Sequence, residues 1–147
     1  MATYNLHRTQ QPLGGNIKQG LNWVHIRIDF SKQNCAQNDD LKLLEVKNHW
    51  ILSEGWTRIT TATDGASTMD LGTAAGGNQL DDAIDIDSAS DTWTAMDTLA
   101  VETGIAITAD GYIYARVLDA AVSSGIVDVM LAIIVPAWDS EVDSIAE

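Results

Sequence analysis

The sequence TDGASTMDLG at residues 63–72 places an Asp-Gly turn directly before a short apolar strand. Asp-Gly between apolar runs tolerates the positive φ angles that tight reversals require, so it is a strong local signal for a β-hairpin. The preceding residues 56–63 are rich in Thr and other types that favour strands. We therefore predict that residues 56–63 pair with residues 67–72 through the turn at Asp64-Gly65.

A second stretch, ITADGYIYARVL at residues 107–118, repeats this pattern. It predicts a second hairpin, in which residues 105–108 pair with residues 112–118. Between residues 63 and 135 the chain has no His, no Cys, no Lys and one Arg. Because reactive side chains are so scarce here, this region favours a role in packing over a role in catalysis.

Residues 24–30 show the clearest strand pattern, because Val24, Ile26, Ile28 and Phe30 alternate with polar residues. Further strands are predicted at residues 41–46, 92–96 and 126–135, and residues 78–84 are predicted to form one helical turn capped by Asn78.

The last predicted strand, residues 126–135, is apolar on both faces apart from Asp128. Such a run is typical of a central strand, or of one covered by a second sheet or subunit. About eight short strands with close turn signals predict an all-β fold, an antiparallel sandwich or a barrel.

The length of 147 residues favours a single domain with a sizeable core. Residues 1–20 lack periodicity and predict an extended N-terminal arm, residues 21–138 a single β domain, and residues 139–147 an acidic tail. The N-terminus shows no signal peptide, and the longest apolar run is about half the length of a membrane span. The single Cys35 forms no internal disulfide, so we expect a protein made in the cytoplasm, with no membrane partner.

Charge is spread unevenly along the chain. Residues 1–58 carry seven Lys or Arg against five Asp or Glu (+2), whereas residues 59–147 carry one Arg against sixteen acids (−15), which sums to −13. So acidic a surface repels phosphate backbones and argues against a nucleic-acid partner. One interpretation is that the acids keep the fold soluble. The other is that they face outward on an assembly, while the less acidic N-terminal part contacts a partner.

No motif predicts a catalytic, cofactor or metal site. His7, His25, His49 and Cys35 lack the spacing of metal ligands. The Asp-rich segment 81–91 fails the EF-hand template, which leaves a solvated acidic loop as the simpler interpretation and an irregular cation site as the alternative. No nucleophile–base pair is placed, so we predict that the protein is not an enzyme.

Strand faces supply the remaining candidates. Tyr112, Tyr114 and Arg116 share one face of their strand, and Met130 and Ile134 share one face of the last strand. An apolar face left uncovered by its own chain is unusual on a monomer, so we predict an interface at these residues, together with Leu13 of the arm. The alternative is that the two sheets of a sandwich cover these faces.

The order of these motifs resembles one family. A Thr-rich strand, an Asp-Gly turn, DLGT at residues 70–73, a Gly/Asp/Ala loop, ITADGYIYA at residues 107–115, an Ala/Ser/Gly turn and a long apolar strand follow one another. This order is similar to that of capsid decoration, or cement, proteins of tailed bacteriophages, which have jelly-roll or related β-sandwich folds. The resemblance covers roughly residues 55–135.

The resemblance implies a jelly-roll-like virion protein that trimerises on the outer capsid surface and clamps the major capsid protein. It also implies that a terminal arm reaches the shell, which would suit residues 1–20. The alternative function is a head-fibre or tail-associated adhesion domain that binds a host glycan through exposed Trp and Tyr.

Overall fold

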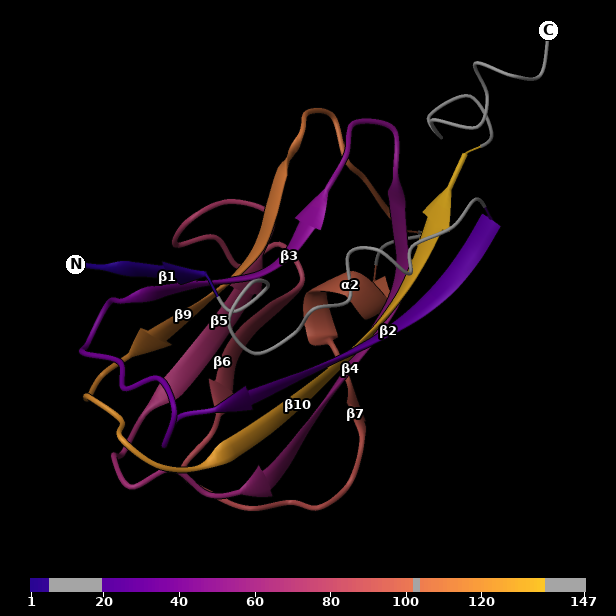
Figure 1. Ribbon diagram of the computed structural model, residues 1–147. Coiled ribbons are helices and arrows are strands. Elements are labelled where there is room, and N and C mark those ends of the chain that lie inside the picture. Colours follow the sequence, from indigo (N-terminus) through magenta and orange to yellow (C-terminus); the bar gives the residue numbers. More distant parts are fainter. Residues whose placement is uncertain (6–19, 102–103, 137–147) are drawn as a thin grey trace, which may run out of the picture.

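The computed structural model describes residues 1–5, 20–101 and 104–136, which form two sheets packed face to face (Figure 1). The first sheet has the strand order β1 (Thr3–Asn5), β3 (Asp40–Val46), β9 (Gly111–Leu118), β5 (Thr68–Gly72) and β6 (Asp81–Asp85). The second has the order β2 (Gly20–Asp29), β10 (Ile126–Val135), β4 (Ile51–Thr61) and β7 (Thr94–Ala95). The short β8 (Ile105–Ala106) pairs with β4, and one short helix, α2 (Asp97–Val101), follows β7.

The connectivity is that of a jelly roll. When β1 and β8 are left out, the remaining strands can be counted in chain order, from β2 as the first to β10 as the eighth. Counted in this way, the second sheet contains the first, eighth, third and sixth strands. The second, seventh, fourth and fifth strands make the first sheet, so the chain passes repeatedly between layers as two interleaved Greek keys do. Every pairing is antiparallel except that of β1 with β3. The predicted all-β sandwich is confirmed.

The core lies between the sheets and follows the alternation seen in the sequence. The inward residues of β2 are almost fully buried, as are Val127, Val129, Leu131 and Ile133 of β10. β10 lies between β2 and β4, as its doubly apolar sequence predicted.

The predicted hairpin at Asp64-Gly65 is wrong. β4 belongs to the second sheet and β5 to the first, so this turn is a corner at which the chain crosses between layers. The Asp64 carboxylate accepts hydrogen bonds from the backbone N–H of Ser123 (2.8 Å) and Ser124 (3.2 Å), which ties the corner to the loop before β10. Asp-Gly specifies a reversal of the chain, but the apolar faces of the flanking strands decide which sheet each strand joins.

The second predicted hairpin, at Asp110-Gly111, is wrong for the same reason. β8 pairs with β4, whereas β9 pairs with β3 and β5 in the other sheet. Asp110 accepts a hydrogen bond of 2.9 Å from the backbone N–H of Asn48 and thereby links two loops at one end of the sandwich.

The helical turn predicted at residues 78–84 is absent, because residues 81–85 form the edge strand β6. The backbone N–H of Leu80 bonds to Leu71 and that of Ala83 to the Asp70 carboxylate, which draws the segment onto β5. These tertiary hydrogen bonds outweigh the local preference for a helical turn.

The predicted arm and tail fall mostly outside the described residues, so their boundaries stay predictions. Thr3–Asn5 form a strand beside β3. Gly20, at the start of β2, pairs with Val135, at the end of β10. The two strand ends therefore lie side by side at one corner of the second sheet (Figure 1).

Candidate functional site

A carboxylate surrounded by cations lies on the outer face of the second sheet. Asp128 of β10 has no exposed surface although its side chain points away from the core. Its Oδ1 contacts His25 Nε2 at 2.8 Å and Arg27 Nε at 2.9 Å, and its Oδ2 contacts Arg58 at 3.3 Å and the Thr60 hydroxyl at 2.5 Å. The contacts come from the flanking strands β2 and β4, so one carboxylate joins three strands.

This network sets the protonation of Asp128. Burial alone would raise the pKa of the carboxyl, but hydrogen bonds from Arg27, Thr60 and His25 more than offset it and hold the pKa well below its usual range. Trp93 covers the network, with its ring 4.9 Å from the Arg58 guanidinium and 6.1 Å, edge-on, from the His25 ring.

Next to this network lies an apolar surface, here called the Trp face, formed by Leu21, Trp23, Trp56, Met130 and Ile134. The rings of Trp23 and Trp56 stack at 5.6 Å, and Ala132, which lies opposite Trp23 on β10, is almost fully buried. Trp23 is 53% exposed, Leu21 59% and Ile134 37%. Large apolar side chains are therefore displayed side by side at one end of this sheet.

The outer face of the first sheet has different chemistry. The rings of Tyr112 and Tyr114 meet edge-to-face at 6.2 Å, and the Lys42 ammonium lies 4.5 Å from the centre of the Tyr112 ring. All three side chains are half-buried, and each has a polar tip.

Arg116 lies on the same face but has a structural partner. Its guanidinium donates two hydrogen bonds to the Asp40 carboxylate, at 2.9 and 2.6 Å, and Asp40 also accepts the backbone N–H of Gly76 at 3.0 Å. A Cβ added at Gly76 would lie 2.6 Å from this guanidinium, and the φ of +72° there favours glycine. The pair thus anchors the loop after β5.

The structure does not bring the predicted interface residues together. Met130 and Ile134 lie on the outer face of the second sheet, whereas Tyr112, Tyr114 and Arg116 lie on that of the first. Leu13 lies outside the described residues.

Sequence reasoning missed the network around Asp128 and three of the five residues of the Trp face. The available signal was Asp128 itself, because a carboxylate in a doubly apolar central strand needs cations from its neighbours. A second signal was the continuation of the β2 alternation outward through Leu21 and Trp23, which places both on the face opposite the core.

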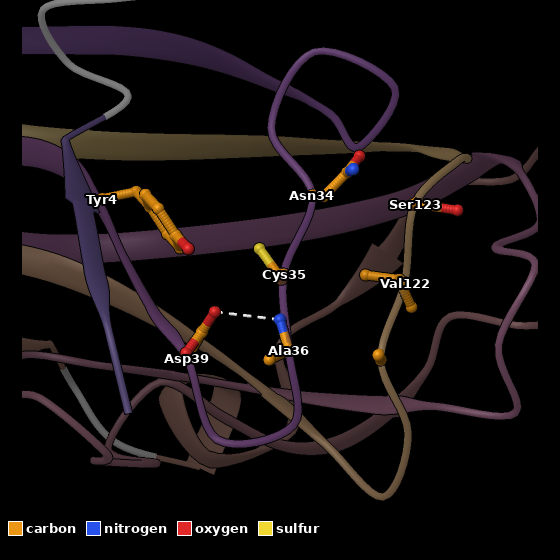
Figure 2. Close-up of a pocket in the computed structure, with 8 residues that line it drawn as sticks. Tyr4, Asn34, Cys35, Ala36, Asp39, Val122 and Ser123 are labelled. Carbon is orange, nitrogen blue, oxygen red and sulfur yellow. Dashed lines mark hydrogen bonds between the residues drawn. The ribbon is translucent and has the colours of Figure 1, made fainter.

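A pocket of about 370 Å³ opens at another edge of the sandwich, between β1 and the loop before β10 (Figure 2). It is lined by Tyr4, Asn34, Cys35, Ala36, Asp39, Ala121, Val122 and Ser123. In Figure 2 the Tyr4 ring points toward Cys35 and Asp39, and Asp39 is bonded to the backbone of Ala36.

The groups in this pocket are committed to structure. Burial raises the pKa of the Cys35 thiol to about 12, so the thiol stays protonated and is a poor nucleophile. Burial also works to raise the pKa of Asp39, but the backbone N–H groups of Ala2 (2.8 Å) and Ala36 (2.9 Å) lower it below the usual value. The Asp39 carboxylate thereby holds the N-terminal strand against the loop.

Asp81, in the Asp-rich segment, forms an unusual pair with Asp97 at the start of α2. Burial, followed by a hydrogen bond to Asp97, raises the pKa of Asp81 to about 7, and the same hydrogen bond lowers the pKa of Asp97. The Asp81 carboxyl therefore stays protonated to a much higher pH than an ordinary carboxyl, with Asp97 as its hydrogen-bond partner. Among the described residues, no three His, Cys, Asp or Glu side chains gather closely enough to hold a metal ion.

His25 and Thr60 do not form a nucleophile–base pair with each other. His25 contacts Asp128, and the Thr60 hydroxyl donates to Asp128 as well instead of to His25. His49 has a φ of +75° in the turn before β4. Within the part of the chain that the structure covers, no helix is long and apolar enough to cross a membrane.

The candidate sites are therefore the outer faces of the two sheets of a jelly-roll sandwich. Comparison with known proteins shows where sandwiches of this kind occur. No protein-family model matches the sequence, and neither does any curated protein sequence.

Solved bacteriophage capsids contain chains with this fold. The chain is similar to one in the capsid of Ralstonia phage GP4, with a TM-score of 0.62 and 14% identity over 91% of this chain and 97% of that chain. For the capsid of cyanophage Pam1 the TM-score is 0.56, at 14% identity over 82% and 89% of the two chains. For the acidic stable capsid of Helicobacter pylori bacteriophage KHP30 it is 0.54, at 13% identity over 82% and 91%. At such identities the likeness establishes a shared fold.

Proposed function

We propose that this chain is a non-enzymatic virion protein that decorates and stabilises the capsid of a tailed bacteriophage. It binds the major capsid protein on the outer surface of the shell, as a homotrimer, after synthesis in the host cytoplasm. The fold shared with three capsid chains supports the virion location, and the motif order described above supports the decoration role.

One observation carries this proposal most directly. The match to the Ralstonia phage GP4 chain extends over 97% of that chain, so the capsid chain is itself a small sandwich of similar length. The likeness is not to a module inside a much longer shell protein. A small, separate capsid chain is the form that an added, stabilising component takes.

The physical basis of stabilisation is shared burial over many copies. Each copy contributes a modest contact area, and linkage of contacts within an oligomer raises the effective concentration of the remaining ones. A net charge of −13 keeps unbound copies apart in solution, while local apolar surfaces provide contact sites.

Reconstitution would test the proposal. Capsids assembled from the major capsid protein of the same phage, without this chain, are incubated with the purified protein, sedimented, and heated in parallel with bare capsids. We expect saturable co-sedimentation and a higher disruption temperature. A strictly monomeric protein that does not sediment with capsids would overturn the proposal.

The exposed Trp23 favours a second candidate, the adhesion domain that binds a host glycan. Indole rings open to solvent on one side are the surfaces on which sugar rings stack, and Trp23 is 53% exposed. Glycan-array binding that is lost on changing Trp23, Trp93 or Tyr112 to Ala would support this function over decoration.

A further inference from the structure

The Trp face combines apolar exposure with order. Trp23 is already fixed by its stack on Trp56, and Met130 and Ile134 are held on the central strand β10. Binding through side chains that are ordered beforehand loses little conformational entropy. Contiguous apolar patches of this kind mark protein–protein contact sites on soluble proteins.

The charge of this sheet face favours a second copy of the chain as the partner. The outer side of β2, β4 and β10 carries two basic residues, Arg27 and Arg58, and three acidic residues, which are Asp29, Glu54 and Asp128. The net charge of this face is therefore −1, whereas the net charge of the whole chain is −13. The acids are thus concentrated on other parts of the protein. A copy of so acidic a chain repels an identical copy almost everywhere, and the repulsion is weakest where acids are scarce.

We propose that the Trp face is the surface through which copies of this chain associate with one another. Leu21, Trp23 and Ile134 of one copy bury against the neighbouring copy, and the network around Asp128 lies at the rim of the contact. This inference rests on the proposed function, because it specifies which surface builds the oligomer. The outer face of the first sheet, with its tyrosines, is left available for other contacts.

Charge substitution at the centre of the patch tests this assignment. Trp23→Glu places an acid where two copies meet, and Leu21→Asp does the same without removing the indole stack, so an effect of misfolding is separated from an effect on association. Tyr112→Glu, on the opposite sheet face, is the matched control. Molar mass is measured by light scattering over a hundredfold range of concentration, with circular dichroism and melting curves to verify the fold.

We expect an oligomeric wild type and an oligomeric Tyr112→Glu variant, and folded monomers for both Trp-face variants. Added salt should strengthen the wild-type oligomer, because it screens repulsion between acidic copies without weakening apolar contact. Oligomers that persist in both folded Trp-face variants would overturn the inference.

Capsid co-sedimentation of the same proteins separates this inference from the proposed function. A monomeric wild type that sediments with capsids and loses this property on Leu21→Asp would assign the Trp face to the shell, overturning the inference and supporting the decoration role. A monomeric wild type whose β2 amides exchange faster after deletion of residues 137–147 would show that the chain covers its own face, which also overturns the inference. A protein that oligomerises through the Trp face but never binds capsids would support the inference and overturn the decoration role.

Discussion

The two sheets each hold a buried carboxylate on their outer side, but they neutralise it differently. In the first sheet, Asp40 of β3 meets Arg116 on the adjacent strand β9, directly opposite in register. In the second sheet, Asp128 of β10 collects His25 and Arg27 from one neighbouring strand and Arg58 from the other. The first arrangement is a single ion pair between two strands, whereas the second joins three strands across the sheet.

This difference determines what each outer face offers to a partner. The network around Asp128 gathers both arginines of the second sheet's outer face at one end, and the Trp face occupies the other end, where Glu54 lies opposite Ala132. The first sheet instead spreads Lys42, Tyr112 and Tyr114 over its surface, each with a polar tip that water can solvate. The second sheet therefore suits a lasting apolar contact, and the first suits a solvated or reversible one.

Removal of the Asp128 carboxylate should produce the largest change in stability. Asp128→Ala leaves Arg27, Arg58 and His25 close together without a counter-charge, and a cost of about 3 kcal/mol in the free energy of unfolding is expected. Chemical denaturation measures it. Glu54→Ala, an exposed carboxylate on the same sheet face, is the control, with an expected change below about 0.5 kcal/mol. Equal effects of the two substitutions would show that the network does not hold the sheet together.

The pair in the first sheet should contribute less. Arg116→Ala leaves Asp40 with one remaining hydrogen bond, from Gly76, and exposes it to water that the guanidinium had excluded. We expect a loss of about 2 kcal/mol, smaller than for Asp128 because water replaces the lost partner. A double-mutant cycle with Asp40→Ala measures the coupling, and a coupling energy near zero would contradict the ion pair.

The sequence predicted those features of the two sheets that depend on local pattern. Alternation in residues 24–30 correctly separated the core face from the polar face, and alternation in residues 112–118 placed Tyr112, Tyr114 and Arg116 on one face, because the side-chain period of a strand is fixed by its backbone. The central position of β10 followed from its apolar residues on both faces. The jelly-roll topology came from the resemblance, and the strand order of the two sheets confirms it.

Pairing between distant strands could not be predicted in the same way. The turns at Asp64-Gly65 and Asp110-Gly111 look like hairpins locally, but whether the chain stays in one sheet depends on strands elsewhere. In the network around Asp128, Arg27 lies 101 positions and Arg58 lies 70 positions before Asp128 along the chain. No local pattern connects such residues, so the site emerges only from the folded sheet.

Asp81 and Asp128 predict opposite responses to pH. The pKa of Asp81 is raised to about 7, so the stability that it contributes is present below the unfolded value of about 4 and is lost as the pH rises through 7. The pKa of Asp128 is lowered, so its contribution is present above about 4 and is lost as the pH falls further.

Melting curves between pH 3 and pH 8 measure these responses. Stability should fall between pH 5 and pH 7 by up to about 1 kcal/mol per pH unit, and Asp81→Asn should remove most of this slope. Asp128→Asn should instead flatten the fall below pH 4. Asp91→Asn, an exposed acid in the same region, is the control. A slope unchanged by Asp81→Asn would show that the proton is held elsewhere.

The smallest expected effect concerns Lys42, whose ammonium lies over the Tyr112 ring. A cation–π contact at a half-exposed site contributes about 0.5 kcal/mol, so Lys42→Ala should change the free energy of unfolding by no more than this. Lys47→Ala, which breaks the surface pair with Glu45, provides a control for the loss of a positive charge. Neither change should alter the molar mass in solution, because Lys42 lies on the first sheet and Lys47 directly follows its strand β3. If Lys42→Ala dissociated the oligomer while Trp23→Glu did not, the roles assigned to the two faces would have to be exchanged.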